Sequence, residues 1–183
     1  MDNQTQFPVH KNHRLKMYDY GASGDYYITI CTEQRKKILC NISDEPLFEI
    51  IPTEIGKKVN EAIANIEKIY ENAYISAYVL MPNHIHFILH IDSNTDKLKM
   101  VTQKGFDVSG QPARGSVPEI VKSFKSVTTR AYRKITGTQD SLWQKSFYDE
   151  IIERAEHYDN VYAYIEDNPR NWKTDTGDHK QFK

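Results

Sequence analysis

Hydrophobic positions along the chain follow two patterns, one typical of β-strands and one typical of α-helices. Four stretches rich in β-branched and aromatic residues predict strands, at residues 26–32, 73–80, 84–91 and 146–151. The middle two strands are separated by Met81-Pro82-Asn83, a sequence typical of a tight turn. These two strands are therefore expected to form a hairpin.

Hydrophobic residues at three- and four-residue spacing predict helices between and after the strands. The first helix begins at Pro52 and ends near Asn72. The last helix extends from about residue 154 to residue 168, where Pro169 is expected to stop it because proline cannot donate a backbone hydrogen bond.

A further helix is predicted after Ser116, with stronger signals at both of its ends. Ser116 and Glu119 form an S-x-x-E capping box, and Pro118 lies within the first turn. Gly137 is expected to end the helix in a left-handed conformation.

The order of these elements is strand, helix, strand, strand, helix, strand, helix. Its first six members follow the split βαβ pattern of the ferredoxin-like fold, and the seventh is an additional C-terminal helix. We therefore expect an α+β fold with an antiparallel sheet in one domain spanning residues 1–183. Within it, residues 1–24 form a basic N-terminal arm and residues 93–115 form a flexible loop.

Composition is that of a soluble globular protein, with 39% hydrophobic and 27% charged residues in 183. Two cysteines are too few for a disulfide framework, and the N-terminus has no apolar signal segment. No apolar stretch is long enough to cross a bilayer. These features predict a cytoplasmic protein with reduced thiols and no membrane association.

Positive charge is concentrated although the net charge is −1. Residues 97–135 contain nine Lys or Arg and two acidic residues, which gives +7 in that stretch. Nucleic-acid phosphates are a natural partner for such a patch, and a solvated helix face is an equally frequent explanation. The candidate phosphate contacts are Arg14 and Lys16 in the arm and Lys122, Lys125, Arg130 and Arg133 in the helix.

Two histidines in the predicted third strand are candidate metal ligands. His84 and His86 are two residues apart, so a strand directs both imidazoles to the same face, and His90 shares it. The intervening residues Ile85 and Phe87 are expected in the core. An H-x-H pair also occurs by chance in strands, so a third ligand decides between the two interpretations.

The last helix offers that ligand beside a candidate nucleophile. Its apolar stripe is predicted to contain Ala155, Tyr158, Val161, Tyr162 and Ile165. A second face, about 120° away, is predicted to contain His157, Asn160, Tyr164 and Asn168. Tyr164 is then either a half-packed aromatic residue or a phenolic nucleophile one turn from an amide oxygen suited to Mg²⁺ or Mn²⁺.

The chain resembles a known family in three segments between Arg14 and Trp172. MPNHIHFIL resembles the His-hydrophobic-His (HUH) signature of single-tyrosine transposases. The pattern W-Q-x-x-F-Y-D-x-I-I at residues 143–152, followed by Y-I-x-x-N-P at 164–169, is similar to REP-associated tyrosine transposases and their insertion-sequence relatives. The segment DYGASGDYYITICTEQR is similar to the N-terminal part of that family.

The resemblance implies a ferredoxin-like enzyme that nicks and joins single-stranded DNA, often at hairpin or palindromic ends, through a 5′-phosphotyrosine. Tyr164 matches the nucleophile, and His84, His86 and Asn168 match the ligands of Mg²⁺ or Mn²⁺. Many relatives have histidine where this chain has Glu150, so Glu150 and His157 are candidates for an accessory role in proton transfer. Both a monomer and a homodimer remain open.

Other interpretations of the same residues remain open. A replication initiator or relaxase-like HUH nickase would use His90 in place of Asn168. A catalytically silent protein would bind DNA hairpins without forming a tyrosine adduct. A zinc hydrolase would need a carboxylate beside the H-x-H pair. Exposed aromatics could stack unpaired bases or serve only in packing, with Tyr18, Tyr20 and Trp172 as the candidates.

Overall fold

A four-stranded antiparallel sheet forms the centre of the protein. The computed structural model describes residues 22–44, 46–92 and 115–172, so Arg14, Lys16 and most of the expected loop lie outside the described residues. The strands are β1 (Gly24–Cys31), β4 (Ala73–Met81), β5 (His84–Ile91) and β6 (Tyr148–Ile152). Their order across the sheet is β4-β5-β1-β6, and each neighbouring pair is antiparallel. This arrangement confirms the predicted α+β, ferredoxin-like class.

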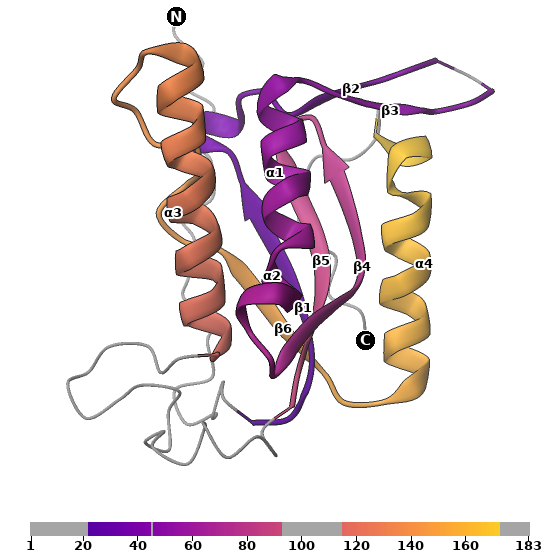
Figure 1. The fold of residues 1–183 in the computed structure, drawn as a ribbon. Helices are drawn as coiled ribbons and strands as arrows, with labels where there is room; N and C mark the ends of the chain where they lie inside the picture. Colours follow the sequence, from indigo (N-terminus) through magenta and orange to yellow (C-terminus); the bar gives the residue numbers. More distant parts are fainter. Residues whose placement is uncertain (1–21, 45, 93–114, 173–183) are drawn as a thin grey trace, which may run out of the picture.

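Helices cover both faces of this sheet, as Figure 1 shows. One face carries α1 (Glu54–Ala64), α2 (Ile66–Ile69) and α3 (Val117–Thr136), and the other carries α4 (Ala155–Asn171). The additional C-terminal helix is therefore isolated from the other three by the sheet. Among the described residues, no helix combines the length and apolar character required to span a membrane.

Alternating residues of β5 contribute to two separate hydrophobic clusters. Ile85, Phe87, Leu89 and Ile91 are fully buried on the α1–α3 side, as the strand period predicts. Each such side chain contributes about 1.5–3 kcal/mol to folding when fully buried. Ile88 belongs to the smaller cluster beneath α4. The even-numbered positions of β5 therefore face α4, and among these are His84 and His86.

The segment before α1 differs from the prediction. Pro52 ends β3 (Ile50–Pro52), which pairs with β2 (Cys40–Ile42) in a short hairpin that the sequence pattern did not indicate. The helix instead begins after Thr53, whose side chain accepts a hydrogen bond from the Gly56 amide at 3.1 Å. Gly56 lies so close to the Leu39 carbonyl that a Cβ there would collide with it.

The ends of α3 follow the prediction in position but not in every contact. Gly137 adopts a left-handed conformation (φ 73°) and ends the helix, as expected. Ser116 is the N-cap residue, yet its side chain forms no capping hydrogen bond. Glu119 instead accepts from the Gly115 amide at 3.2 Å and from the Tyr70 hydroxyl at 2.8 Å. The carboxylate therefore ties α3 to the end of α2 rather than closing a capping box.

Pro169 does not stop the last helix, which continues to Asn171. The proline lies in the final turn, where few hydrogen bonds remain for it to interrupt. Its carbonyl accepts from the Trp172 amide at 3.4 Å. As a result, Trp172 is held at the end of α4 rather than in a separate tail.

Cys40 is expected to resist alkylation in the folded protein. Burial raises the pKa of its thiol to about 12, and the thiol donates to the Leu80 carbonyl at 3.3 Å. Because the thiolate is the reactive species, iodoacetamide near pH 8 should leave Cys40 unmodified until denaturant is added, as peptide mass spectrometry would show. Modification of Cys40 at the rate of an unfolded peptide would contradict this burial.

Candidate active site

The two histidines of the H-x-H motif lie side by side at the beginning of β5. Their ring centroids are 4.5 Å apart, with an interplanar angle of 73°. His84 and His86 are 0% and 2% exposed, respectively. Since the strand alternation directs both toward α4, two buried imidazoles occupy the narrow space between the sheet and that helix.

Hydrogen bonds at Nδ1 hold both imidazoles. His84 Nδ1 lies 2.6 Å from Asn83 Oδ1, and an amide oxygen only accepts, so that nitrogen carries the proton. His86 Nδ1 lies 2.7 Å from the Tyr27 hydroxyl and 2.7 Å from the Thr29 hydroxyl. Such outer partners fix the orientation of metal-binding histidines. In each ring, Nε2 is consequently the nitrogen suited to binding a metal.

Helix α4 brings Tyr164 against this pair. Its ring centroid lies 5.4 Å from that of His86 and 6.4 Å from that of Tyr27, in edge-on arrangements. At the end of the same helix, the Trp172 ring lies 6.2 Å from the His84 ring. The phenol and the two imidazoles thus share one site.

Asn168 lies one helical turn after Tyr164 and one turn before Trp172, both of which contact the histidines. Its side chain is 1% exposed. Its Oδ1 is buried without a hydrogen-bond partner among the described residues. A buried amide oxygen in that state costs free energy unless a ligand satisfies it. Tyr164 and Asn168 therefore lie one turn apart on α4, and the amide is the more deeply buried of the two.

The buried face of α4 differs from the predicted apolar stripe. Ala155 is exposed and Tyr162 is 42% exposed, whereas the polar Asn168 is buried together with Val161 and Ile165. The buried face is rotated toward Tyr164 because the helix packs against the histidines as well as against hydrophobic residues. Hydrophobic periodicity alone places the helix in the wrong phase here.

Glu150 and His157, the two candidate accessory residues, are brought together. His157 Nε2 lies 3.5 Å from Glu150 Oε1, and Glu150 Oε2 accepts from the Tyr148 hydroxyl at 2.7 Å. Burial, together with that carboxylate, raises the pKa of Tyr148. The Tyr148 ring in turn packs edge-on against Tyr27. Tyr148 and Tyr27 therefore lie between the Glu150–His157 pair and the imidazole of His86.

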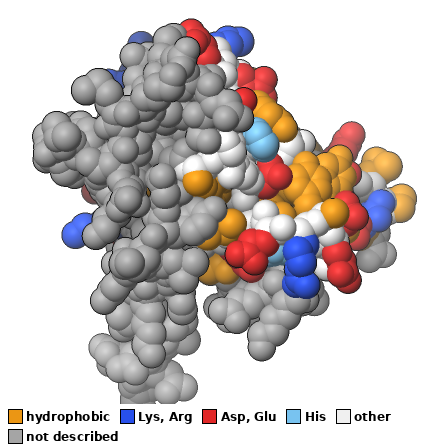
Figure 2. Space-filling model, turned by 90° about the horizontal axis from the view of Figure 1, so that it is seen from below, with side chains coloured by type: hydrophobic (Ala, Val, Ile, Leu, Met, Phe, Trp, Pro, Cys, Tyr) orange, Lys and Arg blue, Asp and Glu red, His pale blue; other side chains and the backbone are white. Residues whose placement is uncertain are grey.

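His90 lies at the opposite end of the sheet and is separate from this site. Four residues of strand place it about 13 Å from His86. Its Nδ1 is 2.9 Å from Asp25 Oδ1, and its ring stacks on Tyr74 at 4.6 Å. Figure 2 views this end of the molecule, where hydrophobic and acidic side chains gather over the visible described surface.

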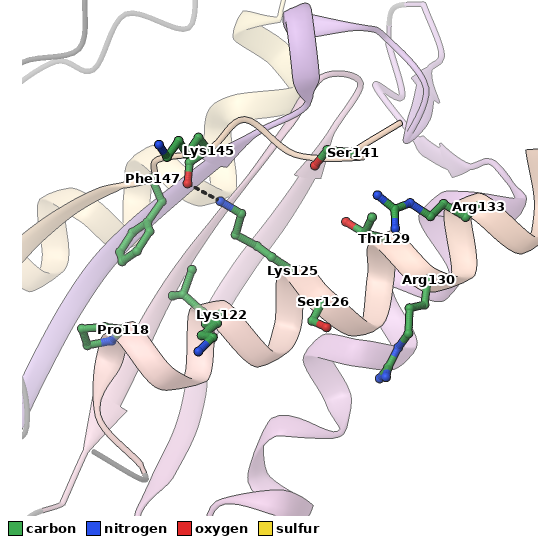
Figure 3. Close-up of a pocket in the computed structure, with 11 residues that line it drawn as sticks. Pro118, Lys122, Lys125, Ser126, Thr129, Arg130, Arg133, Ser141, Lys145 and Phe147 are labelled. Atoms are coloured by element: carbon green, nitrogen blue, oxygen red, sulfur yellow. Dashed lines mark hydrogen bonds between the residues drawn. The ribbon is translucent and has the colours of Figure 1, made fainter. Parts of the chain in front are cut away.

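The four predicted phosphate contacts of α3 line an open groove of about 380 Å³. The opposite wall is the segment before β6, which adds Ser141, Lys145 and Phe147 (Figure 3). Lys125 reaches across and donates to the Gln144 and Lys145 carbonyls at 2.6 and 3.0 Å. Because α3 and α4 cover opposite faces, the sheet separates this basic groove from Tyr164.

Within the described ranges, His, Cys, Asp and Glu side chains form no group of three able to hold a metal. The buried Asn168 amide oxygen, unpartnered within the described part of the chain, is therefore the candidate for a third protein donor beside the two imidazoles. The buried Asn168 oxygen and the fixed imidazoles fit a cation that takes nitrogen and oxygen ligands.

Several residues of the site were not predicted from the sequence. Tyr27 and Thr29 contact His86 because β1 pairs with β5 in a register that places Thr29 opposite His86. The register in which two distant strands pair cannot be predicted from the local sequence of either strand. Asn83 could have been anticipated, since it precedes His84 directly in the turn. Trp143, part of the motif after α3, is instead a core residue whose indole donates to Thr128 at 2.7 Å.

Comparison with known proteins identifies a relative and a shared fold. No protein-family model matches the chain. An uncharacterised protein of Haemophilus influenzae is 30% identical over 165 residues, which cover 88% of this chain and 89% of that protein. The chain belongs to the same family as that protein.

Solved structures extend the comparison to the fold. A REP-associated tyrosine transposase bound to a REP hairpin has a TM-score of 0.57 and 16% identity, over 91% of this chain and 74% of its own. A putative transposase of Deinococcus radiodurans has a TM-score of 0.46 and 14% identity, over 88% of this chain and 97% of its own. The first likeness establishes a common fold.

Proposed function

We propose that this protein is a transposase-type enzyme that nicks and rejoins single-stranded DNA through a covalent bond to Tyr164. The observation that carries the proposal is the packing of Tyr164 against His86, which in turn packs against His84, with the buried Asn168 one turn further along the helix of Tyr164. A phenol beside two buried imidazoles supplies a nucleophile and metal ligands in the same small space.

In the proposed first step, the Tyr164 oxygen attacks the scissile phosphorus in line with the departing 3′ oxygen. The O–P bond to tyrosine forms as the P–O3′ bond breaks, which leaves a 5′-phosphotyrosine and a free 3′-hydroxyl. The phenol loses its proton and the leaving oxygen gains one. A second 3′-hydroxyl can reverse the reaction, so strands are rejoined without ATP.

His84, His86 and Asn168 would hold a divalent cation through the two Nε2 atoms and the amide oxygen. Mg²⁺ or Mn²⁺ at that position would offset the charge that develops on the scissile phosphate. Two nitrogen donors favour Mn²⁺ over Mg²⁺, since imidazole is a ligand of transition metals and Mg²⁺ prefers oxygen. Asn83, Tyr27 and Thr29 would keep both rings in the orientation that this binding requires.

The accessory pair has a more distant role in this proposal. Glu150 accepts from Tyr148, which keeps its proton because its pKa is raised, and lies 3.5 Å from His157, so the carboxylate and the imidazole are the groups of this cluster that can accept a proton. Tyr27, which contacts the rings of both Tyr148 and Tyr164, would fix the position of the phenol relative to the pair. We propose that the pair accepts the phenolic proton through intervening solvent, with Glu150 in place of the histidine of similar proteins.

The substrate is proposed to be single-stranded DNA with hairpin ends, in keeping with the hairpin bound by the transposase of common fold. The direct test is incubation with single strands from both flanks of the protein's own gene, in the presence of Mn²⁺. A protein–DNA band that survives denaturation supports the proposal. Hairpin binding without such a band would instead indicate the catalytically silent DNA-binding protein.

The basic groove on α3 is expected to contact the DNA backbone away from the cut. Lys122→Glu combined with Arg130→Glu should weaken DNA binding by about tenfold or more and reduce its salt dependence by about one unit of slope per lost phosphate contact. Fluorescence anisotropy at several salt concentrations would measure both quantities. Lys58→Glu, which reverses the charge of an exposed lysine on α1, is the control. Equal weakening by both variants would contradict a specific role for the groove.

A further inference from the structure

A second group of cations lies beside the histidines, away from the groove on α3. Residues 33–35 form a short 3₁₀ helix after β1, and Arg35, Lys36 and Lys37 follow one another there. Lys36 and Lys37 are exposed. The phosphate contacts predicted from the sequence lie in the N-terminal arm and in α3, and they do not include this group.

Hydrogen bonds fix this segment to the turn that precedes His84. The Thr32 amide donates to the Asn83 carbonyl at 2.9 Å, and the Ile38 and Leu39 amides donate to the Pro82 carbonyl at 2.9 and 3.0 Å. The backbone that carries these cations is therefore held at a set position relative to the turn before His84, while their side chains can move.

The same segment contains an unusual backbone conformation. Gln34 and Arg35 have φ values of 55° and 54°, in the left-handed region that residues with a Cβ rarely adopt. The Thr32 hydroxyl, which donates to the Lys36 carbonyl at 2.8 Å, closes the turn. Two residues after this turn, Lys37 lies over the ring of Trp172 at the end of α4.

Lys37 meets Trp172 there. Its Nζ lies 5.4 Å from the centroid of the indole ring, and the indole lies 6.2 Å from the His84 ring. Along the site, the order is therefore Lys37, Trp172, His84, His86 and Tyr164. A cation and an aromatic surface adjoin the imidazole pair on the His84 side, whereas Tyr164 adjoins it on the His86 side.

We propose that Lys37 and Trp172 form a binding site for one nucleotide of single-stranded DNA next to the cut. This inference rests on the proposed function and adds the contact that positions the strand. The base stacks on the indole, since an unpaired base offers a π-face of any sequence. The Lys37 ammonium, on its flexible stem, moves from the indole to the phosphate of that nucleotide.

Trp172 also provides a direct signal for this contact. Of the two tryptophans, Trp143 is 1% exposed in the core, whereas Trp172 is only partly buried. Stacking of a base on Trp172 should quench its fluorescence on titration with the single-stranded flank oligonucleotides. Trp172→Leu should remove that quenching, while the emission of Trp143 is unchanged.

The experiment compares variants in both binding and adduct formation with the same oligonucleotides. Lys37→Glu and Trp172→Leu should each weaken binding by about tenfold, and Lys37→Glu should lower the salt slope by about one. Lys37→Arg and Trp172→Phe keep a cation and an aromatic ring, respectively, so each should retain most of the wild-type affinity for DNA. Lys68→Glu, an exposed lysine on α2, is the control.

Abasic substitutions next to the cut separate a DNA contact from a structural effect. In the wild-type protein, removing one particular base should weaken binding about tenfold, and in Trp172→Leu that same removal should have no further effect. If the wild-type protein forms its tyrosine adduct but all variants behave like it, the nucleotide site is wrong and the proposed function stands. If no adduct forms with any flank strand, both are wrong.

Discussion

Tyr164→Phe should abolish the covalent protein–DNA adduct while leaving DNA binding nearly unchanged. The substitution removes the hydroxyl that would attack the phosphate, and loss of a covalent nucleophile typically lowers activity by several orders of magnitude. The ring that packs against His86 and Tyr27 is retained, so the fold should be preserved. Denaturing electrophoresis measures the adduct, and fluorescence anisotropy measures binding.

Tyr162→Phe is the matched control for this experiment. Tyr162 lies on the same helix, is 42% exposed and stacks on Tyr158, away from the histidines. That variant should form the adduct at the wild-type rate. An adduct of undiminished yield in Tyr164→Phe would show that another residue is the nucleophile.

His86→Ala should remove both Mn²⁺ binding and cleavage. The variant deletes one of two nitrogen donors, and even the outer hydrogen-bond partners of metal ligands contribute about 10- to 100-fold to affinity. We therefore expect the affinity for Mn²⁺ to fall by more than about 100-fold. Calorimetry on the DNA-free protein measures binding separately from activity.

Two companion variants make this result specific. His84→Gln should also lose Mn²⁺ binding and cleavage. Because glutamine is polar and similar in size to histidine, this result would show that the loss does not come from an empty space in the buried site. His90→Ala should have none, because His90 lies on the same strand and face but is paired with Asp25 at the other end of the sheet. Cleavage by His86→Ala in the presence of EDTA would contradict the metal role.

Local patterns were sufficient to predict the sheet and the side-by-side histidines. β1, β4 and β5 are each eight or nine residues long, so their alternation is visible in the sequence. The β2–β3 hairpin consists of three-residue strands, which are too short for a periodic signal. Ile51 within it is 52% exposed, so hydrophobicity does not mark its buried face either.

The C-terminal helix shows why the site was only partly predictable. Tyr162 is hydrophobic but exposed, and Asn168 is polar but buried, so a stripe drawn from hydrophobicity is out of phase. Such departures from the local pattern are expected where side chains serve a site rather than the core. The contacts of Tyr27 with His86 and of Lys37 with Trp172 depend on tertiary packing, which no short segment encodes.

The most direct test of the central claim is to identify the residue that becomes linked to DNA. The wild-type protein is incubated with single-stranded flank oligonucleotides and Mn²⁺, then digested with nuclease and protease, and the modified peptide is sequenced by mass spectrometry. The proposed chemistry predicts a 5′-phosphonucleotide on the hydroxyl of Tyr164. A nucleotide attached to any other side chain would contradict it.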